Sequence, residues 1–308
     1  GLRKEYRAGR RSKPKVALHD IHLKIERGGF FGLLGPNGAG KSTLINILAG
    51  LVIKTSGSAQ VWGNDIDHAS RQARASIGVV PQELMIDPFF TPREALDLQA
   101  GYYGVPRSER CTNDILAAVG LTDLADAYAR TLSGGMRRRL MVAKAMVHTP
   151  PVLVLDEPTA GVDVELRKQL WSYVLELNAS GTTVLLTTHY LEEAEQLCDR
   201  IAIIHNGNLV ACDSTTALVQ RLDQKMLTIA LAEDIDQLPR ALANFDVELK
   251  PHRRLLIRYR PSHTQIGAIL AAVQSAGLTI LDLTTEESDL EDVFIELTRS
   301  HDVGGTAA

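Results

Sequence analysis

The segment GPNGAGKST at residues 35–43 constrains this chain more than any other stretch of it. The segment fits the pattern G-x-x-x-x-G-K-[ST]. An apolar run precedes it at 28–34, and the helical spacing of Leu44, Ile47 and Leu48 follows it. A glycine-rich loop between a buried strand and a helix turns backbone N–H groups and the positive end of the helix toward phosphates. We therefore predict that a nucleoside triphosphate binds to Gly35, Pro36, Asn37, Gly38, Ala39, Gly40, Lys41, Ser42 and Thr43.

Two side chains of this loop have expected chemical roles. Lys41 would neutralise the β- and γ-phosphate oxygens, and the hydroxyl of Ser42 would be a ligand of Mg²⁺. An ordinary glycine-rich turn is the alternative. The strand and the helix on the correct sides of the loop disfavour that alternative.

Further polar positions follow apolar stretches that predict strands. Asp156 and Glu157 end the run VLVL, His189 follows VLLTT, and Gln82 follows VVP. Because ligands bind at the carboxyl ends of parallel strands, these side chains are expected beside the phosphate-binding loop. Asp156 would hold Mg²⁺ through water, Glu157 would orient or deprotonate an attacking water, and His189 would reach the γ-phosphate. The alternatives are a surface acid pair and a hydrogen-bonded structural histidine.

Composition and charge exclude several classes of function. The apolar share of 45% and the charged share of 23% are those of an ordinary soluble globular protein. A formal net charge of −4 gives no global basic field, so no specific nucleic acid is expected as a partner. The basic run at residues 1–15 is predicted to be a solvated edge or loop, and contact with anionic lipid or a partner is the alternative. No apolar run approaches the length of a membrane span, and the 3 dispersed cysteines indicate free thiols, so we expect a cytoplasmic protein.

The order of the predicted elements indicates two domains. Alternating strand and helix patterns over residues 1–222 predict an α/β domain whose parallel sheet is covered on both faces. Within it, residues 17–26 alternate as a half-buried antiparallel strand would. After a change of composition near 222–225, the order β-α-β-β-α-β predicts a small α+β, ferredoxin-like accessory domain at 223–302. The predicted elements there include a first helix at 236–245 and a closing helix at 289–300, with a flexible tail at 303–308.

A second glycine motif, TLSGGMRRRL at residues 131–140, also precedes an apolar-periodic run. Ser133, Gly134 and Gly135 therefore look like a second phosphate site at a helix N-terminus. The arginines at 137–139 lie in the first helical turn, where cations oppose the helix dipole. A solvated face is the default expectation for them. A position beside nucleotide or against a partner is the hypothesis for at least one.

Taken in order, these motifs resemble those of the ATP-binding subunits of ABC transporters. They cover most of residues 1–215 in the order and spacing of that family. The chain is similar in particular to ABC-2-type exporter subunits, the group of multidrug, polyketide and lipo-oligosaccharide export. Three features carry this similarity: LSGGM followed by RRRL, the segment THYLEEAE, and the C-terminal segment DLEDVFIELT. The match is carried by GPNGAGKST at 35–43, VPQE at 80–83, LSGGM at 132–136, LVLDEP at 153–158, AGVD at 160–163 and TTHYLEEAE at 187–195.

The resemblance implies an α/β, P-loop NTPase fold of the ABC ATPase type. This fold has an antiparallel β subdomain and a helical subdomain, at about 84–150, that receives the membrane subunit. ATP and Mg²⁺ would be bound, with Tyr6 stacked on the adenine. Gln82 would be a Mg²⁺ ligand and the lever between the γ-phosphate or Mg²⁺ and the membrane subunit.

The resemblance also implies a head-to-tail homodimer. Each ATP would lie between the loop at 35–43 of one subunit and Ser133, Gly134 and Gly135 of the other, and Asp163 belongs to the loop that crosses between them. A second helix N-terminus would add donors to the uncovered flank of the γ-phosphate. The chain departs from the family at Met136, where the commonest residue is Gln. A methionine cannot donate a hydrogen bond from that position.

The implied function is hydrolysis of ATP that drives a separate ABC-2-type permease. The cargo would be a drug, polyketide, lipid or saccharide-type substrate, and the chain would be peripheral at the inner face of the cell membrane. A soluble, non-transport ABC ATPase is the alternative, but the chain lacks the coiled-coil insertions or tandem cassettes of those proteins. A lone P-loop kinase or GTPase is disfavoured by LSGGM and His189, and the chain has no N/T-K-x-D motif for guanine.

Overall fold

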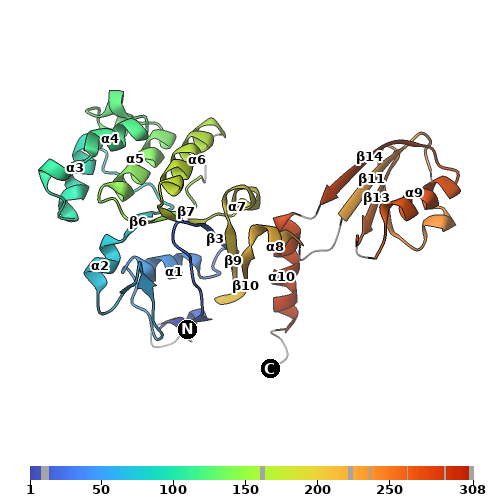
Figure 1. Ribbon diagram of the computed structural model, residues 1–308, viewed down its shortest axis with the longest axis horizontal. Helices are drawn as coiled ribbons and strands as arrows, with labels where there is room; N and C mark the ends of the chain where they lie inside the picture. Colours follow the sequence, from blue (N-terminus) through green and yellow to red (C-terminus); the bar gives the residue numbers. More distant parts are fainter. Residues whose placement is uncertain are drawn as a thin grey trace. The chain divides into compact units, whose positions relative to one another are not determined.

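The computed structural model describes residues 1–7, 14–159, 164–220, 225–235, 237–261, 263–287 and 289–304. The chain divides into two compact units, Gly1–Ser214 and Thr215–Ala308. Figure 1 labels their elements. The first unit contains β1 (Leu2–Tyr6), β2 (Lys15–Ile21), β3 (Phe30–Leu34), α1 (Lys41–Leu48), β4 (Gln60–Val61), β5 (Asn64–Asp65), α2 (Ser70–Ala75), β6 (Ile77–Val80), α3 (Pro92–Tyr102), α4 (Thr112–Ala118), α5 (Gly134–Met146), β7 (Val152–Asp156), α6 (Val164–Ala179), β8 (Thr183–Thr187), α7 (Leu191–Leu197), β9 (Arg200–His205) and β10 (Asn208–Ser214).

A six-stranded sheet of order β10-β9-β3-β8-β7-β6 forms the centre of the first unit. The strands from β9 to β6 are parallel, and only the pairing of β10 with β9 is antiparallel. All residues of β3 and β8 are buried, as apolar strands covered on both faces are. The helices α1 and α6 lie on opposite sides of this sheet (Figure 1). The parallel α/β sheet predicted from the sequence is therefore confirmed.

The parallel order brings several loops to one edge of the sheet. The phosphate-binding loop follows β3, Asp156 ends β7, Thr187 ends β8, and Gln82 lies two residues after β6. Parallel strands end at the same edge, so the fold itself gathers these positions.

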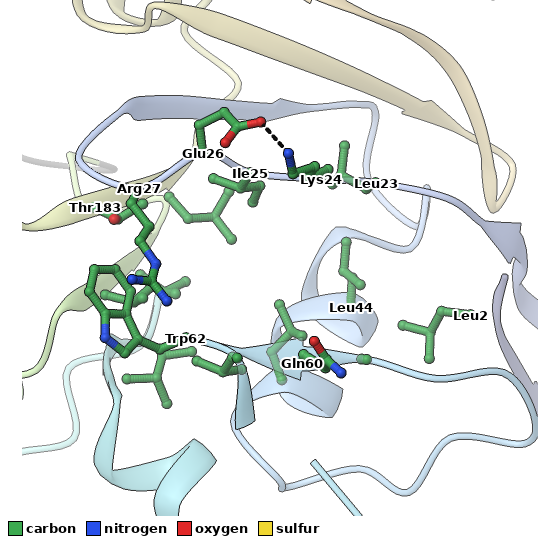
Figure 2. Close-up of a pocket in the computed structure, with 18 of the residues that line it drawn as sticks. Leu2, Leu23, Lys24, Ile25, Glu26, Arg27, Leu44, Gln60, Trp62 and Thr183 are labelled. Atoms are coloured by element: carbon green, nitrogen blue, oxygen red, sulfur yellow. Dashed lines mark ion pairs between the residues drawn. The ribbon is translucent and has the colours of Figure 1, made fainter. Parts of the chain in front are cut away.

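The predicted strand at 17–26 ends early, because β2 stops at Ile21 after pairing with β1. Residues 22–26 do not form part of a strand. Their side chains still alternate, because Leu23 and Ile25 pack against the core. Figure 2 shows these two side chains on one side of a cavity of about 510 Å³, opposite Gln60 and Trp62. Alternation reports which face is buried, but it does not guarantee a partner strand.

The cavity is separate from the phosphate-binding loop. Its lining includes α1 residues such as Leu44 but none of residues 35–43. At its rim the Arg27 guanidinium lies over the Trp62 ring at 4.2 Å, and Lys24 pairs with Glu26 at 2.8 Å (Figure 2).

The helices α3, α4 and α5 form a helical part with its own core, in which Leu96, Leu116 and Leu140 are fully buried. The helix α3 begins with a capping box. The amide of Glu94 donates to the Thr91 hydroxyl at 3.2 Å, and the amide of Thr91 donates to the Glu94 carboxylate at 2.9 Å.

The second unit contains α8 (Thr215–Gln220), β11 (Lys225–Leu231), β12 (Asp246–Lys250), β13 (Arg254–Tyr259), α9 (Ile266–Ser275), β14 (Ile280–Glu287) and α10 (Leu290–Gly304). Its antiparallel sheet has the order β12-β13-β11-β14, the arrangement of a ferredoxin-like module. The helix α8 packs against α10, so the division between the units precedes α8, whereas the change of composition follows it.

The helix predicted at 236–245 is wrong. Among the described residues of this stretch, only Arg240–Leu242 forms a 3₁₀ turn, directly after Pro239. Proline lacks an amide hydrogen and clashes with the preceding helical turn, so it interrupts the apolar spacing that suggested a helix. Leu242 nevertheless fills the core beneath the sheet and is 1% exposed.

Within the part of the chain that the structure describes, no helix combines the length and the apolar character needed to span a bilayer.

Two glycines of the phosphate-binding loop have no room for a side chain. Gly40 has φ 113°, and a Cβ on it would stand 2.6 Å from the carbonyl oxygen of Ala17. A Cβ on Gly35 would stand 2.2 Å from the carbonyl oxygen of Ile204. The loop is therefore wedged between β2 and the end of β9.

We expect Gly40→Ala to destabilise the chain more than Gly63→Ala, a control whose φ is 83° but whose Cβ would meet nothing within 4 Å. The backbone conformation alone costs about 1–2 kcal/mol in each variant. The clash in Gly40→Ala should add about 1–3 kcal/mol. Urea unfolding followed by circular dichroism measures both losses, and equal losses would contradict the steric account.

Candidate nucleotide-binding and catalytic site

Lys41 points back into the phosphate-binding loop from the first turn of α1. Its Nζ donates to the carbonyl oxygens of Gly35 at 2.6 Å and Pro36 at 3.2 Å. The side chain is 6% exposed, and burial lowers the pKa of the ammonium, while Glu157 and Asp156 oppose that shift. A buried ammonium whose hydrogen-bond partners are carbonyls gains further from a bound anion, so this loop fits a triphosphate.

The end of β7 carries the two predicted carboxylates. Asp156 pairs with Thr187 across the parallel strands, and the Thr187 hydroxyl donates to Asp156 Oδ1 at 2.5 Å. The amide of Glu157 donates to the backbone oxygen of Thr187 at 3.0 Å, and it also contacts the Thr187 hydroxyl at 3.1 Å. Glu157 has φ 47°, a conformation that costs a residue other than glycine energy and that clusters at functional sites.

The side chains of Gln82 and His189 converge on one oxygen of Glu157. Gln82 Nε2 donates to Glu157 Oε2 at 2.9 Å, and His189 Nδ1 lies 3.3 Å from the same oxygen. Glu157 is 9% exposed, so its carboxylate stands in a site from which most water is excluded. Three positions far apart in the sequence are therefore brought together, as predicted from their places at strand ends.

The predicted Mg²⁺ ligands are few. Among the described residues, no group of three or more His, Cys, Asp or Glu could hold a metal ion by itself. The hydroxyl of Ser42 is exposed at the start of α1, and Asp156 and Gln82 lie at neighbouring strand ends. This sparse oxygen set fits Mg²⁺, which usually keeps several waters and takes substrate phosphates as ligands.

The second glycine motif forms the start of α5. Ser133 is the N-cap, and its hydroxyl accepts the amide of Met136 at 3.3 Å. Ser133 and Gly134 are exposed, so the turn is open to a ligand. Within the described part of the chain, no hydrogen bond links residues 133–135 to residues 35–43.

The expectation that the arginines at 137–139 form a solvated face is wrong for Arg138. Arg138 is 5% exposed, and its guanidinium donates to the carbonyl oxygens of Pro81 at 2.9 Å and Gln82 at 2.8 Å. The amphipathic pattern alone misses this role, because three consecutive arginines look alike in a sequence.

Other residues that support the site were not singled out from the sequence. The buried Glu193 carboxylate accepts hydroxyl hydrogens from Thr159 at 2.9 Å and Thr188 at 3.2 Å. Arg167 Nε lies 3.4 Å from the same carboxylate, and the Arg167 guanidinium stands 4.8 Å from the Tyr190 ring. Glu193 belongs to a run of acids that resembles an exposed helix face, so only the fold reveals it.

The structure does not test the predicted roles of Tyr6 and Asp163. Tyr6 ends β1 and is 40% exposed, with Lys4 Nζ 4.7 Å above its ring. An exposed ring is available for stacking, and its role on adenine stays a prediction. Asp163 lies outside the described residues.

Comparison with known proteins gives consistent results. Residues 18–160 match the model of the family described as ABC transporter. The chain is 36% identical to the Nod factor export ATP-binding protein I of Ralstonia nicotianae, over 97% of this chain and 92% of the relative. It is also 36% identical to the linearmycin resistance ATP-binding protein LnrL of Bacillus subtilis, over 92% of this chain and 94% of the relative.

A solved structure shares the fold. It is a dimeric ATP-binding cassette in a post-hydrolysis state bound to ADP and Pi, with a TM-score of 0.62 and 26% identity. The match covers 70% of this chain and 96% of that chain. Together with the glycine loop between β2 and β9 and the carboxylate at the end of β7, these similarities show that the chain belongs to the ABC transporter family, as an ATPase subunit that binds ATP with Mg²⁺.

Proposed function

We propose that Glu157 activates the water that hydrolyses ATP, with Gln82 and His189 as its positioning partners. The observation that carries the proposal is the convergence of both partners on Glu157 Oε2, at 2.9 Å and 3.3 Å. A water oxygen would attack the γ-phosphorus, the bond to the β-phosphate oxygen would break, and the water proton would pass to Glu157. Lys41 would neutralise the β- and γ-phosphate oxygens. Ser42 and Gln82 would be ligands of Mg²⁺, and Asp156 would hold the ion through water.

The proposed working unit is a head-to-tail homodimer. The loop at 35–43 is one proposed phosphate site and leaves a flank of the γ-phosphate uncovered. The exposed turn at Ser133 is a second helix N-terminus, and among the described residues it makes no hydrogen bond to that loop. A second copy would bring its ATP to Ser133, Gly134 and Gly135, with Asp163 in the crossing loop. Closure would then depend on ATP, and hydrolysis would remove the group that both subunits hold.

The proposed partner is an ABC-2-type permease, which would dock on the exposed apolar side chains of the segment between β6 and α3. Met85 is 64% exposed and Phe89 is 70% exposed, just beyond the Gln82 segment. Exposed apolar patches of this kind mark interaction sites. Through the permease the chain would be held at the inner face of the cell membrane. The names of the relatives, Nod factor export and linearmycin resistance, favour a drug, polyketide, lipid or saccharide-type cargo.

Glu157→Gln is expected to lower kcat for ATP hydrolysis by about 10²–10⁴-fold, because the amide cannot accept the proton. ATP binding should persist, and an ATP-bound dimer should accumulate in light scattering. Glu192→Gln is the matched control, because Glu192 is an exposed acid in the first turn of α7. Hydrolysis by Glu157→Gln at the wild-type rate would refute the water-activating role.

Ser133→Arg is expected to leave ATP binding to the monomer intact and to abolish ATP-driven dimerisation and hydrolysis. An arginine at the N-cap would fill the space that the partner's phosphate requires. Ser108→Arg adds the same charge at an exposed serine of the helical part and should behave as wild type. Loss of monomer ATP binding in Ser133→Arg would contradict the two-subunit site.

Phe89→Asp is expected to abolish co-purification of an ABC-2-type permease in detergent while leaving the ATPase rate of the isolated chain unchanged. The control is Ile53→Asp, because Ile53 is 84% exposed and lies outside the helical part. Mass spectrometry identifies the membrane protein that co-purifies. A permease retained equally by both variants would exclude this docking surface.

A further inference from the structure

Arg138 ties the helix α5 to the segment that carries Gln82. Its two terminal nitrogens donate to consecutive carbonyl oxygens, those of Pro81 at 2.9 Å and Gln82 at 2.8 Å. The planar fork of a guanidinium suits two neighbouring acceptors, and a lysine ammonium cannot reproduce that geometry. The backbone between β6 and α3 is thus fixed at the residue whose side chain enters the site.

The position of the Gln82 peptide determines where its amide can reach. Gln82 Nε2 donates to Glu157 Oε2 at 2.9 Å, so the contacts run from Arg138 through the backbone of Gln82 to the carboxylate. A displaced peptide would move the amide from the carboxylate, because the side chain has a fixed length.

The burial of Arg138 is costly for the fold. The side chain is 5% exposed, and burial lowers the pKa of its guanidinium. Its Nε is buried and makes no hydrogen bond to the described part of the chain. A buried cation held by backbone carbonyls contributes little net stability, so a role in placing the Gln82 segment accounts for it better than a role in folding.

The neighbouring arginines bind elsewhere. Arg137 donates to the backbone oxygens of Ala129 at 3.3 Å and Arg130 at 2.9 Å, and Arg139 donates to that of Val119 at 2.7 Å. These acceptors all belong to the helical part. Of the three consecutive arginines, Arg138 is therefore the one that reaches the site, and Arg137 is a matched control on the same helix.

We propose that Arg138 is a positioning residue for ATP hydrolysis, which holds the Pro81–Gln82 backbone so that the Gln82 amide stays on Glu157. Arg138 does not touch the reacting atoms and acts through Gln82. This inference rests on the role proposed above for Gln82.

A double-mutant cycle on the full chain tests the inference through steady-state ATPase kinetics. Arg138→Met should lower kcat about tenfold or more while KM for ATP changes little, because small displacements in a site cost rate rather than ground-state binding. Arg138→Lys should retain an intermediate kcat, since one ammonium reaches one carbonyl. Arg137→Met should keep the wild-type kcat.

The decisive comparison uses Gln82→Ala. If Arg138 acts through Gln82, then Arg138→Met should cause no further loss of kcat in the Gln82→Ala background. Two outcomes would overturn the inference and leave the role of Gln82 intact. In one, the losses of kcat from the two substitutions multiply in the double variant. In the other, folded Arg138→Met keeps the wild-type kcat while Gln82→Ala is impaired. A wild-type kcat for Gln82→Ala would instead refute the role of Gln82.

Thermal unfolding identifies whether each variant is folded. If Arg138→Met does not fold, the Arg138→Lys comparison in both backgrounds decides the question. A lysine variant that loses activity equally in the presence and absence of Gln82 would then overturn the proposal.

Discussion

The parallel register of β7 and β8 places Asp156 beside Thr187, and the proposed catalytic arrangement depends on that pairing. Thr187 supports both acids, because its hydroxyl donates to Asp156 while its backbone oxygen accepts the amide of Glu157. This second bond helps to hold Glu157 at φ 47°, a conformation that it would otherwise disfavour. A slip of one residue between these strands would turn the side chains to opposite faces and disperse the cluster.

Two buried cations show how differently the fold uses the same kind of contact. Lys41 and Arg138 are each nearly inaccessible, and each donates to a pair of consecutive backbone carbonyls. Burial lowers the pKa of both groups. Lys41 contacts the loop proposed to bind phosphate, and the charges of Glu157 and Asp156 act on its ammonium, so a bound anion would offset its desolvation. Arg138 instead donates to the backbone of Pro81 and Gln82, and we attribute its burial to its proposed role in holding that segment in place.

Sequence reasoning reached the residues whose role follows from local context. The loop at 35–43 was predictable because strand, glycines and helix are contiguous, and Asp156, Glu157, Gln82 and His189 were predictable because they end apolar strands. Contacts made by side chains that do not follow a strand were not predictable. The carbonyls that bind Arg138 and the hydroxyls that bind Glu193 come from elsewhere in the chain. The strand expected at 17–26 ends at Ile21, and the described residues of the helix expected at 236–245 form only a 3₁₀ turn. Side-chain spacing indicates which residues are buried, whereas strand pairing and Pro239 decide the backbone.

Met136 departs from the family motif, but the backbone geometry of the turn at Ser133 does not depend on its side chain. The amide of Met136 donates to the Ser133 hydroxyl, so the backbone of the first turn of α5 is preserved. The Met136 side chain is partly buried and packs against the helical core. A glutamine there would gain a side-chain donor and lose an apolar contact. The proposed phosphate contacts of the turn are its backbone amides and Ser133, and those groups do not depend on the side chain at position 136, which instead packs against the helical core.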